Sequence, residues 1–74
     1  GADIKGNRRI IEVETAGTVA DAARQLSGYK KPVYVAGADA KATASAVKRY
    51  KGTTIGVIDE HGKTVKRSTR KRKS

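Results

Sequence analysis

Residues able to do chemistry are few in this chain. One histidine, His61, stands beside Asp59 and Glu60, and there is no cysteine. A metal site needs three or four converging ligands, and a nucleophilic triad needs a base with an orienting partner. The spacing indicates neither, so we interpret His61 as an exposed turn residue and expect no metal and no cofactor.

Two carboxylates, Glu12 and Glu14, fall two residues apart and therefore point to the same side of a predicted strand. Catalytic carboxylates normally face each other across a cleft, on elements whose environments separate their pKa values. We interpret this pair as a solvated strand face, or as partners for Lys5 and Arg8. With a single histidine and no acid-base cluster, the sequence predicts that the protein is not an enzyme.

Two glycine-containing loops, 15–18 and 36–39, follow predicted strands and precede predicted helices. Open α/β sheets bind ligands at such positions, where helix N-termini offer free N–H groups to anions. Neither loop has the spacing of a dinucleotide or phosphate fingerprint, and Asp39 would repel a phosphate. Turn geometry is the simpler interpretation of Gly17 and Gly37, and a small-molecule ligand at these loops is the last alternative.

Basic residues form the strongest signal. The chain has 17 Lys and Arg against 7 Asp and Glu, a net charge of +10, and residues 63–74 hold seven of the cations and no acid. Clusters at 29–31 and 48–51 each include a tyrosine, and stacking on a base is worth about 1–3 kcal/mol. A polyanionic partner is predicted, nucleic acid first. The candidate nucleic-acid-binding residues are Lys30, Lys31, Lys48, Arg49, Tyr50, Lys51, Lys63, Lys66, Arg67, Arg70, Lys71, Arg72 and Lys73.

The elements that must position these residues follow from apolar periodicity and from glycine and capping residues. Strands are predicted over 8–15, 32–36, 53–59 and 63–67, with helices after Thr18 and Asp39 that end at Gly28 and Gly52. On the first strand Ile11 and Val13 share one face. On the second helix the predicted apolar stripe comprises Ala40, Thr43, Ala44, Val47 and Tyr50, and packing is the favoured role of Tyr50.

The predicted order is βαβαββ, a small α/β domain of the α+β sandwich type. Right-handed crossovers make the first three strands mostly parallel, with helices on at least one face, and the fourth strand antiparallel at an edge. Residues 1–7 are predicted to be a flexible lead-in, 8–67 a single domain, and 68–74 a disordered basic tail, because the segment STRKRKS has nothing apolar to bury.

Two resemblances attach to the central segment. The run VYVAGADAKATASAV, within this element order, is similar to the strand-helix core of Alba-type chromatin and RNA-binding proteins, which also build a basic surface. With residues 18–22 before it, the same segment looks like the repeats of bacterial cell-wall-binding proteins. Fold analogy alone does not transfer function.

The sequence therefore predicts a non-enzymatic nucleic-acid-binding protein of low sequence specificity, which uses a basic surface and a polybasic tail. The alternative is a structural or assembly protein of a virion, ribosome or cell wall, anchored by its tail to an anionic particle. A protein partner or a homodimer stays open. No span of the membrane and no signal peptide are expected, which favours an intracellular or particle-associated protein.

Overall fold

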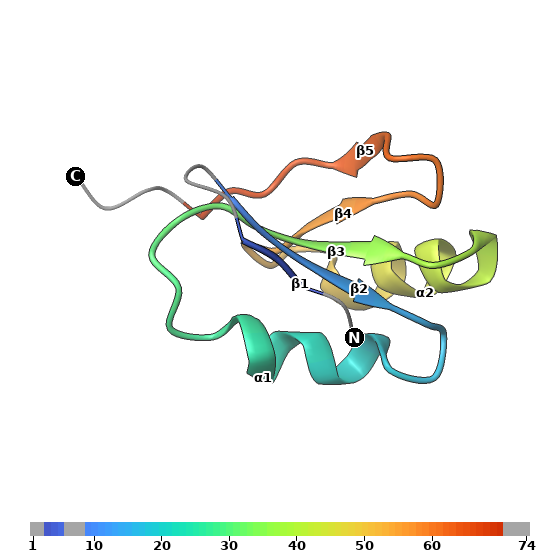
Figure 1. Cartoon of the computed structure of the whole chain (residues 1–74), viewed down its shortest axis with the longest axis horizontal. Coiled ribbons are helices and arrows are strands. Elements are labelled where there is room, and N and C mark those ends of the chain that lie inside the picture. The colour runs from blue at the N-terminus through green and yellow to red at the C-terminus, as the bar shows by residue number, and fades with distance from the viewer. Residues whose placement is uncertain (1–2, 6–8, 71–74) are drawn as a thin grey trace.

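The computed structural model describes residues 3–5, by their backbone alone, and residues 9–70 (Figure 1). Eight elements follow one another along the chain. They are β1 Asp3–Lys5, β2 Ile10–Glu14, the short 3-10 helix η1 Val19–Asp21, α1 Ala22–Leu26, β3 Val33–Gly37, α2 Ala40–Tyr50, β4 Gly56–Ile58 and β5 Thr64–Lys66.

All five strands join one sheet in the order β1-β2-β3-β4-β5. The central pairs β2-β3 and β3-β4 are parallel, and β5 lies antiparallel to β4 at one edge. This confirms the predicted α/β fold, its mostly parallel strands and its antiparallel edge hairpin.

The predicted flexible lead-in over residues 1–7 is wrong at its centre, because Asp3–Lys5 forms the edge strand β1. It pairs antiparallel with β2, and Ile4 lies opposite Ile11. Three residues between glycines carry too short an alternation for a strand to be read from the sequence. Their pairing depends on the exposed edge that β2 offers.

Both helices cover the same face of the sheet. Right-handed crossovers from β2 to β3 and from β3 to β4 advance in one direction across the sheet, so each one places its helix on the same side. The core between the layers is made of β-branched strand residues, small helix residues and one tyrosine. Its buried members are Ile10, Val19, Ala22, Leu26, Val33, Val35, Ala42, Ala46, Tyr50, Ile55 and Val57.

No helix of the described residues lies on the opposite face of the sheet. A second, smaller apolar cluster lies on it, formed by Ile11, Tyr34 and Ile58 with Ala36 packed beside them. Because side chains alternate across a strand, Ile11 and Val13 share this face, as predicted. We call it the helix-free face.

Helix ends agree with the sequence in three of four places. The Asp39 carboxylate accepts a hydrogen bond from the Ala42 amide at 2.8 Å, and Gly28 and Gly52 adopt φ of +87° and +80° just after the two helices. These left-handed conformations suit glycine. The predicted Thr18 cap is wrong, because its hydroxyl accepts instead from the Thr15 amide at 2.9 Å and the helix opens as a 3-10 turn.

The buried stripe of α2 differs from the predicted one. Ala42, Ala46 and Tyr50 are fully buried, whereas Ala40 and Ala44 are exposed. Alanine occupies every second position from 40 to 46, so apolar periodicity alone leaves the rotation of this helix undetermined. The short side chains let α2 lie close to β3, where Gly37 has no room for a Cβ beside Thr43.

Candidate nucleic-acid interface

The two ends of the parallel strands differ in charge. Loops that precede β3 and β4, and the end of α2, gather at the amino end of these strands and carry most of the predicted cations. We define the amino-end surface as the exposed or half-buried cations of this region, Arg9, Lys30, Lys31, Lys48, Arg49, Lys51 and Arg67. At the other end of the strands lie Asp39, Asp59 and Glu60, with the single histidine.

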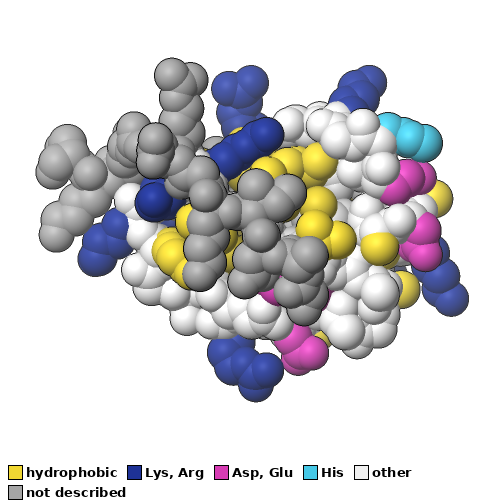
Figure 2. Space-filling view, viewed as in Figure 1, with side chains coloured by type: hydrophobic (Ala, Val, Ile, Leu, Met, Phe, Trp, Pro, Cys, Tyr) yellow, Lys and Arg dark blue, Asp and Glu magenta, His cyan; other side chains and the backbone are white. Residues whose placement is uncertain are grey.

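Figure 2 shows one face of the molecule. The histidine lies at the right with acidic side chains beside it, whereas Lys and Arg side chains project on every side of the view, the right included. Apolar side chains lie in the middle of this face. A cation is more favourable where no carboxylate competes with a phosphate, so the amino end is the better position for a polyanion.

The start of the basic tail is docked on this amino end. Arg70 donates from Nη1 to the carbonyl oxygens of Leu26, at 2.7 Å, and Tyr29, at 3.3 Å, and from Nε to the Thr54 hydroxyl. The carbonyls of Leu26 and Tyr29 lie at the end of α1, where the helix dipole favours a cation. Arg70 thereby joins the tail to the segment after α1, more than 40 positions earlier in the chain.

Ser68 strengthens this docking. Its hydroxyl donates to the Thr54 carbonyl at 2.7 Å and accepts from the Val33 amide at 3.2 Å, while the Thr69 amide donates to Thr54 at 3.0 Å. The predicted boundary of a disordered tail at residue 68 therefore differs from the structure, in which residues 68–70 contact the domain. Residues 71–74 of that tail lie outside the described residues.

Lys66, another predicted binding residue, is also engaged within the domain. Its ammonium donates to the carbonyls of Thr53, at 3.0 Å, and Ile55. An ammonium has three donors and can therefore serve both carbonyls of this loop before β4 at once. Lys66 and Arg70 thus hold the chain in place, and the exposed cations around them are better placed for an external anion.

Tyr50 belongs to the core, although it was among the candidate binding residues. Its side chain is 3% exposed, and its hydroxyl donates to the Val19 carbonyl and accepts from the Ala23 amide at 3.2 Å. The favoured packing role is therefore the one that the structure supports. A base on the surface has no access to this ring.

The remaining candidates divide by position. Lys30, Lys48, Arg49, Lys51 and Arg67 are exposed at the amino end, and Lys31 beside them is half-buried. Lys63 is exposed but lies in the β4-β5 turn, at the acidic end. Lys71, Arg72 and Lys73 lie outside the described residues.

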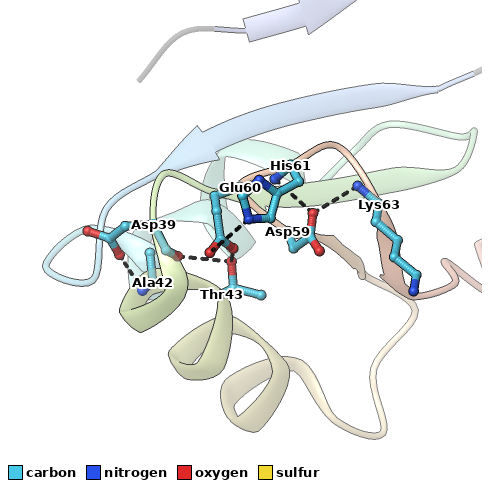
Figure 3. Close-up of polar contacts among 7 residues, drawn as sticks. All are labelled: Asp39, Ala42, Thr43, Asp59, Glu60, His61 and Lys63. Atoms are coloured by element: carbon cyan, nitrogen blue, oxygen red, sulfur yellow. Dashed lines mark hydrogen bonds and ion pairs between the residues drawn. The ribbon is translucent and has the colours of Figure 1, made fainter.

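The acidic end is held by a small polar network (Figure 3). The Asp59 Oδ1 accepts from the backbone amides of His61 and Lys63, both at 2.9 Å, and the hydrogen bond from Lys63 lowers the pKa of this carboxyl below its usual value. Glu60 accepts from the Thr43 hydroxyl at 3.2 Å. The β4-β5 turn is thereby tied to the first turn of α2.

His61 fits the predicted turn residue, since its side chain is 82% exposed. Its Nε2 lies 3.8 Å from a Glu60 oxygen, a distance that gives little stabilisation at the surface. Among the residues that the structure describes, no three His, Cys, Asp or Glu side chains gather as metal ligands.

The predicted solvated face of Glu12 and Glu14 is wrong. Both side chains lie beneath the helices, 3% and 2% exposed, and Glu14 has a buried Oε1 with no hydrogen-bond partner in the described part of the chain. Alternation correctly placed both residues on the face opposite Ile11, but the helices cover that face. The two carboxyl groups therefore lie in the core and not on a solvated surface.

Arg9 is a feature that the sequence analysis missed. Its guanidinium lies over the Tyr34 ring, 5.6 Å from the ring centroid, on the helix-free face. Such a contact between a cation and an aromatic ring is worth about 0.5–1 kcal/mol at an exposed site. The signal was the strand alternation, because Arg9 has the same parity as Ile11 and Val13.

A cavity of about 540 Å³ opens on the same face toward the carboxyl ends of β2, β3 and β4. Ile11, Val13, Ala36 and Ile58 line its floor, with Arg9 at its border. Asp59, Glu60 and the backbone of Gly37, Ala38 and Gly62 complete the rim. The glycine loop at 36–39 thus contributes to the lining of a cavity, which lies on the face opposite the helices.

Comparison with known proteins gives no relative: no family model matches the chain, and no curated protein or solved structure resembles it significantly. Neither resemblance noted in the sequence gains support from this result. Across residues 3–5 and 9–70, no helix is long and apolar enough to cross a membrane.

Proposed function

We propose that this chain is a non-enzymatic nucleic-acid-binding protein whose amino-end surface contacts the phosphate backbone. The observation that supports it most directly is the docking of Arg70 beside residues 29–31. This contact holds Arg70 at the same end of the sheet that carries Lys30, Lys31, Arg49 and Lys51.

The physical basis is counterion release. Each phosphate neutralised by a Lys or Arg on duplex DNA adds about 0.9 to the negative slope of log affinity against log salt. Cations distributed over one end of the sheet suit a backbone that carries charge at regular intervals. Since few of these cations lie on a rigid element that could enter a groove, sequence specificity is expected to be low.

Fluorescence anisotropy tests the proposal. The full chain is titrated with single- and double-stranded DNA and RNA at several salt concentrations, beside a variant in which Lys30, Lys31, Arg49 and Lys51 are replaced by Gln. We expect the variant to lower the duplex slope by about 3 to 4 and the affinity by at least about tenfold.

A matched control replaces Lys41 and Lys63, two cations at the acidic end, by Gln. Its effect on binding is expected to be much smaller than that of the amino-end variant, although both lose charge. Equal losses per charge would show that net charge alone drives binding. No salt-sensitive binding of the full chain to any of the four ligands would overturn the proposal.

The homodimer, which the sequence left open beside the assembly alternative, has one observation in its favour. Val65 is 49% exposed on the edge strand β5 and is the one large apolar side chain so exposed among the residues the structure describes. An open strand edge with an apolar residue is able to pair with another chain. Sedimentation equilibrium of the unmodified chain and of Val65→Lys tests for such a dimer. Only a dimer paired through the β5 edge would dissociate on this change.

A further inference from the structure

The cavity on the helix-free face has a cation at one border and carboxylates at the other. Arg9 lies at one side, and Asp59 and Glu60 lie at the opposite rim. We propose that this cavity binds one base of a single-stranded nucleic acid, and guanine in preference to the other bases. The inference rests on the proposed function, and adds a base-reading subsite to its phosphate-binding surface.

The floor of the cavity suits a flat ligand. Ile11, Val13, Ala36 and Ile58 come from three neighbouring strands and form an apolar surface without a covering helix. Ligand pockets commonly combine such an apolar floor with a few placed polar groups, and about 540 Å³ is in their usual size range. A base that lies on such a floor gains from removing water from the side of its ring that faces the floor.

The rim selects bases that donate hydrogen bonds. The Asp59 carboxylate is positioned by the amides of His61 and Lys63, and Glu60 by the Thr43 hydroxyl. Such acceptors match the Watson–Crick edge of guanine, which presents two adjacent N–H groups. Adenine and cytosine present one amino group, whereas thymine and uracil present a single N–H between two carbonyls that a carboxylate would repel.

The charge order of the cavity also matches that of a nucleotide. With the donor edge of the base toward the carboxylates, its phosphate lies toward Arg9, which belongs to the amino-end surface. A reversed ligand would place its phosphate against Asp59 and Glu60. This arrangement lets the strand continue from the cavity to Lys30 and Lys31.

The test compares three short single strands of about ten nucleotides, long enough for one site of this size. One is oligothymidine, the second has a single central guanine, and the third has hypoxanthine there, which lacks the 2-amino group. We expect the guanine strand to bind about five- to tenfold more tightly than oligothymidine, with hypoxanthine between them.

Two variants test whether the preference for guanine arises in the cavity. Glu60→Gln keeps a carbonyl for Thr43 but weakens the acceptor, and should reduce the guanine preference at least about threefold while leaving oligothymidine affinity unchanged or slightly higher. Val13→Glu fills the cavity with a charge and should abolish the preference. Asp21→Asn, which removes an exposed acid outside the cavity, is the matched control and should change neither quantity.

Amide chemical shifts of the unmodified chain keep the test independent of variant folding. Gly37, Ala38 and Gly62 should shift with the guanine strand and less with oligothymidine. Equal, salt-sensitive affinity for all three strands would overturn the cavity inference and leave the proposed function standing. Absence of binding to every strand would also overturn the cavity inference, and the proposed function would fall with it only if the duplexes were not bound either.

Discussion

The amino and carboxyl ends of the same parallel strands present opposite surfaces. At the amino end, cations from the loop before β3, the end of α2 and the segment after β5 come together around backbone carbonyls that Lys66 and Arg70 occupy. At the carboxyl end, Asp39, Asp59 and Glu60 are held by amides and a hydroxyl.

The difference shows how one small sheet separates two kinds of site. Helix C-termini and loop carbonyls at the amino end favour cations, and helix N-termini with free amides favour carboxylates at the other. A phosphate-binding role at the carboxyl end is disfavoured by those carboxylates, whereas a hydrogen-bond donor is favoured there. The predictions that follow test this separation, from the largest expected effect to the smallest.

Tyr50 tests whether an aromatic residue of the amino end is structural. Tyr50→Ala should lower the free energy of unfolding by about 3–5 kcal/mol, because it empties the space between α2 and η1. Tyr50→Phe keeps the ring and loses only the hydroxyl contacts with Val19 and Ala23, at a cost of about 1–2 kcal/mol.

Denaturant unfolding followed by circular dichroism gives these values, and anisotropy gives DNA affinity. For Tyr50→Phe we expect no change in affinity, since the ring is buried. If the Tyr50 ring contacted a base, Tyr50→Phe would bind DNA with altered affinity while it remained folded.

Glu14 tests the cost of an acid placed in the core. Glu14→Leu should raise the free energy of unfolding by about 1–3 kcal/mol, because it removes a buried oxygen that has no hydrogen-bond partner in the described part of the chain. Glu60→Gln, at an exposed position, is the control and should change stability by less than about 0.5 kcal/mol. A loss of stability in Glu14→Leu would mean that the carboxyl group makes a stabilising contact.

Arg70 tests the anchor of the tail. Arg70→Lys keeps the charge but loses the planar fork that reaches Leu26, Tyr29 and Thr54, and should lower the free energy of unfolding by about 1–2 kcal/mol. Arg67→Lys is the matched control, because Arg67 is exposed and should tolerate the change.

Salt slopes measured on the same two variants separate anchoring from phosphate binding. Since each variant keeps its charge, both slopes should equal that of the unmodified chain. An unchanged stability in Arg70→Lys would show that the hydrogen bonds of the Arg70 guanidinium contribute nothing to the fold. A chain truncated after residue 70 loses the cations of residues 71–73 and keeps Arg70, so it separates the loss of tail charge from the loss of the Arg70 anchor.

Asp59 gives the smallest effect, a pH dependence at the acidic end. Its pKa is lowered in the folded chain from a usual value of 3.8, so its stabilising contribution is present above that pH and is lost as the pH falls through the folded-state pKa. Melting temperatures of the unmodified chain and Asp59→Asn should therefore converge as the pH falls from about 5 through the folded-state pKa, which lies below 3.8. A constant difference across this range would exclude the carboxylate as the cause.

Much of the fold could be predicted because it is encoded locally. Alternation in residues 10–14, the capping carboxylate of Asp39 and the glycines at 28 and 52 each act within a few residues. Strand β1 was not predicted because its alternation covers only a few residues. The rotation of α2 was predicted wrongly because alanine lies on several faces of this helix. For the candidate site, the packing role of Tyr50 was predicted correctly and the contact of Arg9 with Tyr34 was overlooked. The binding role of the exposed cations stays a prediction.

What the sequence by itself determined is the order of elements and the excess of positive charge, since both depend on local pattern and composition. The tertiary structure decided which cations remain outward, because Arg70 and Lys66 find carbonyls distant in the chain. It also decided that Glu12 and Glu14 are buried, because two crossovers of one hand bring both helices over their face. Contacts between distant segments have no periodicity from which they could be read.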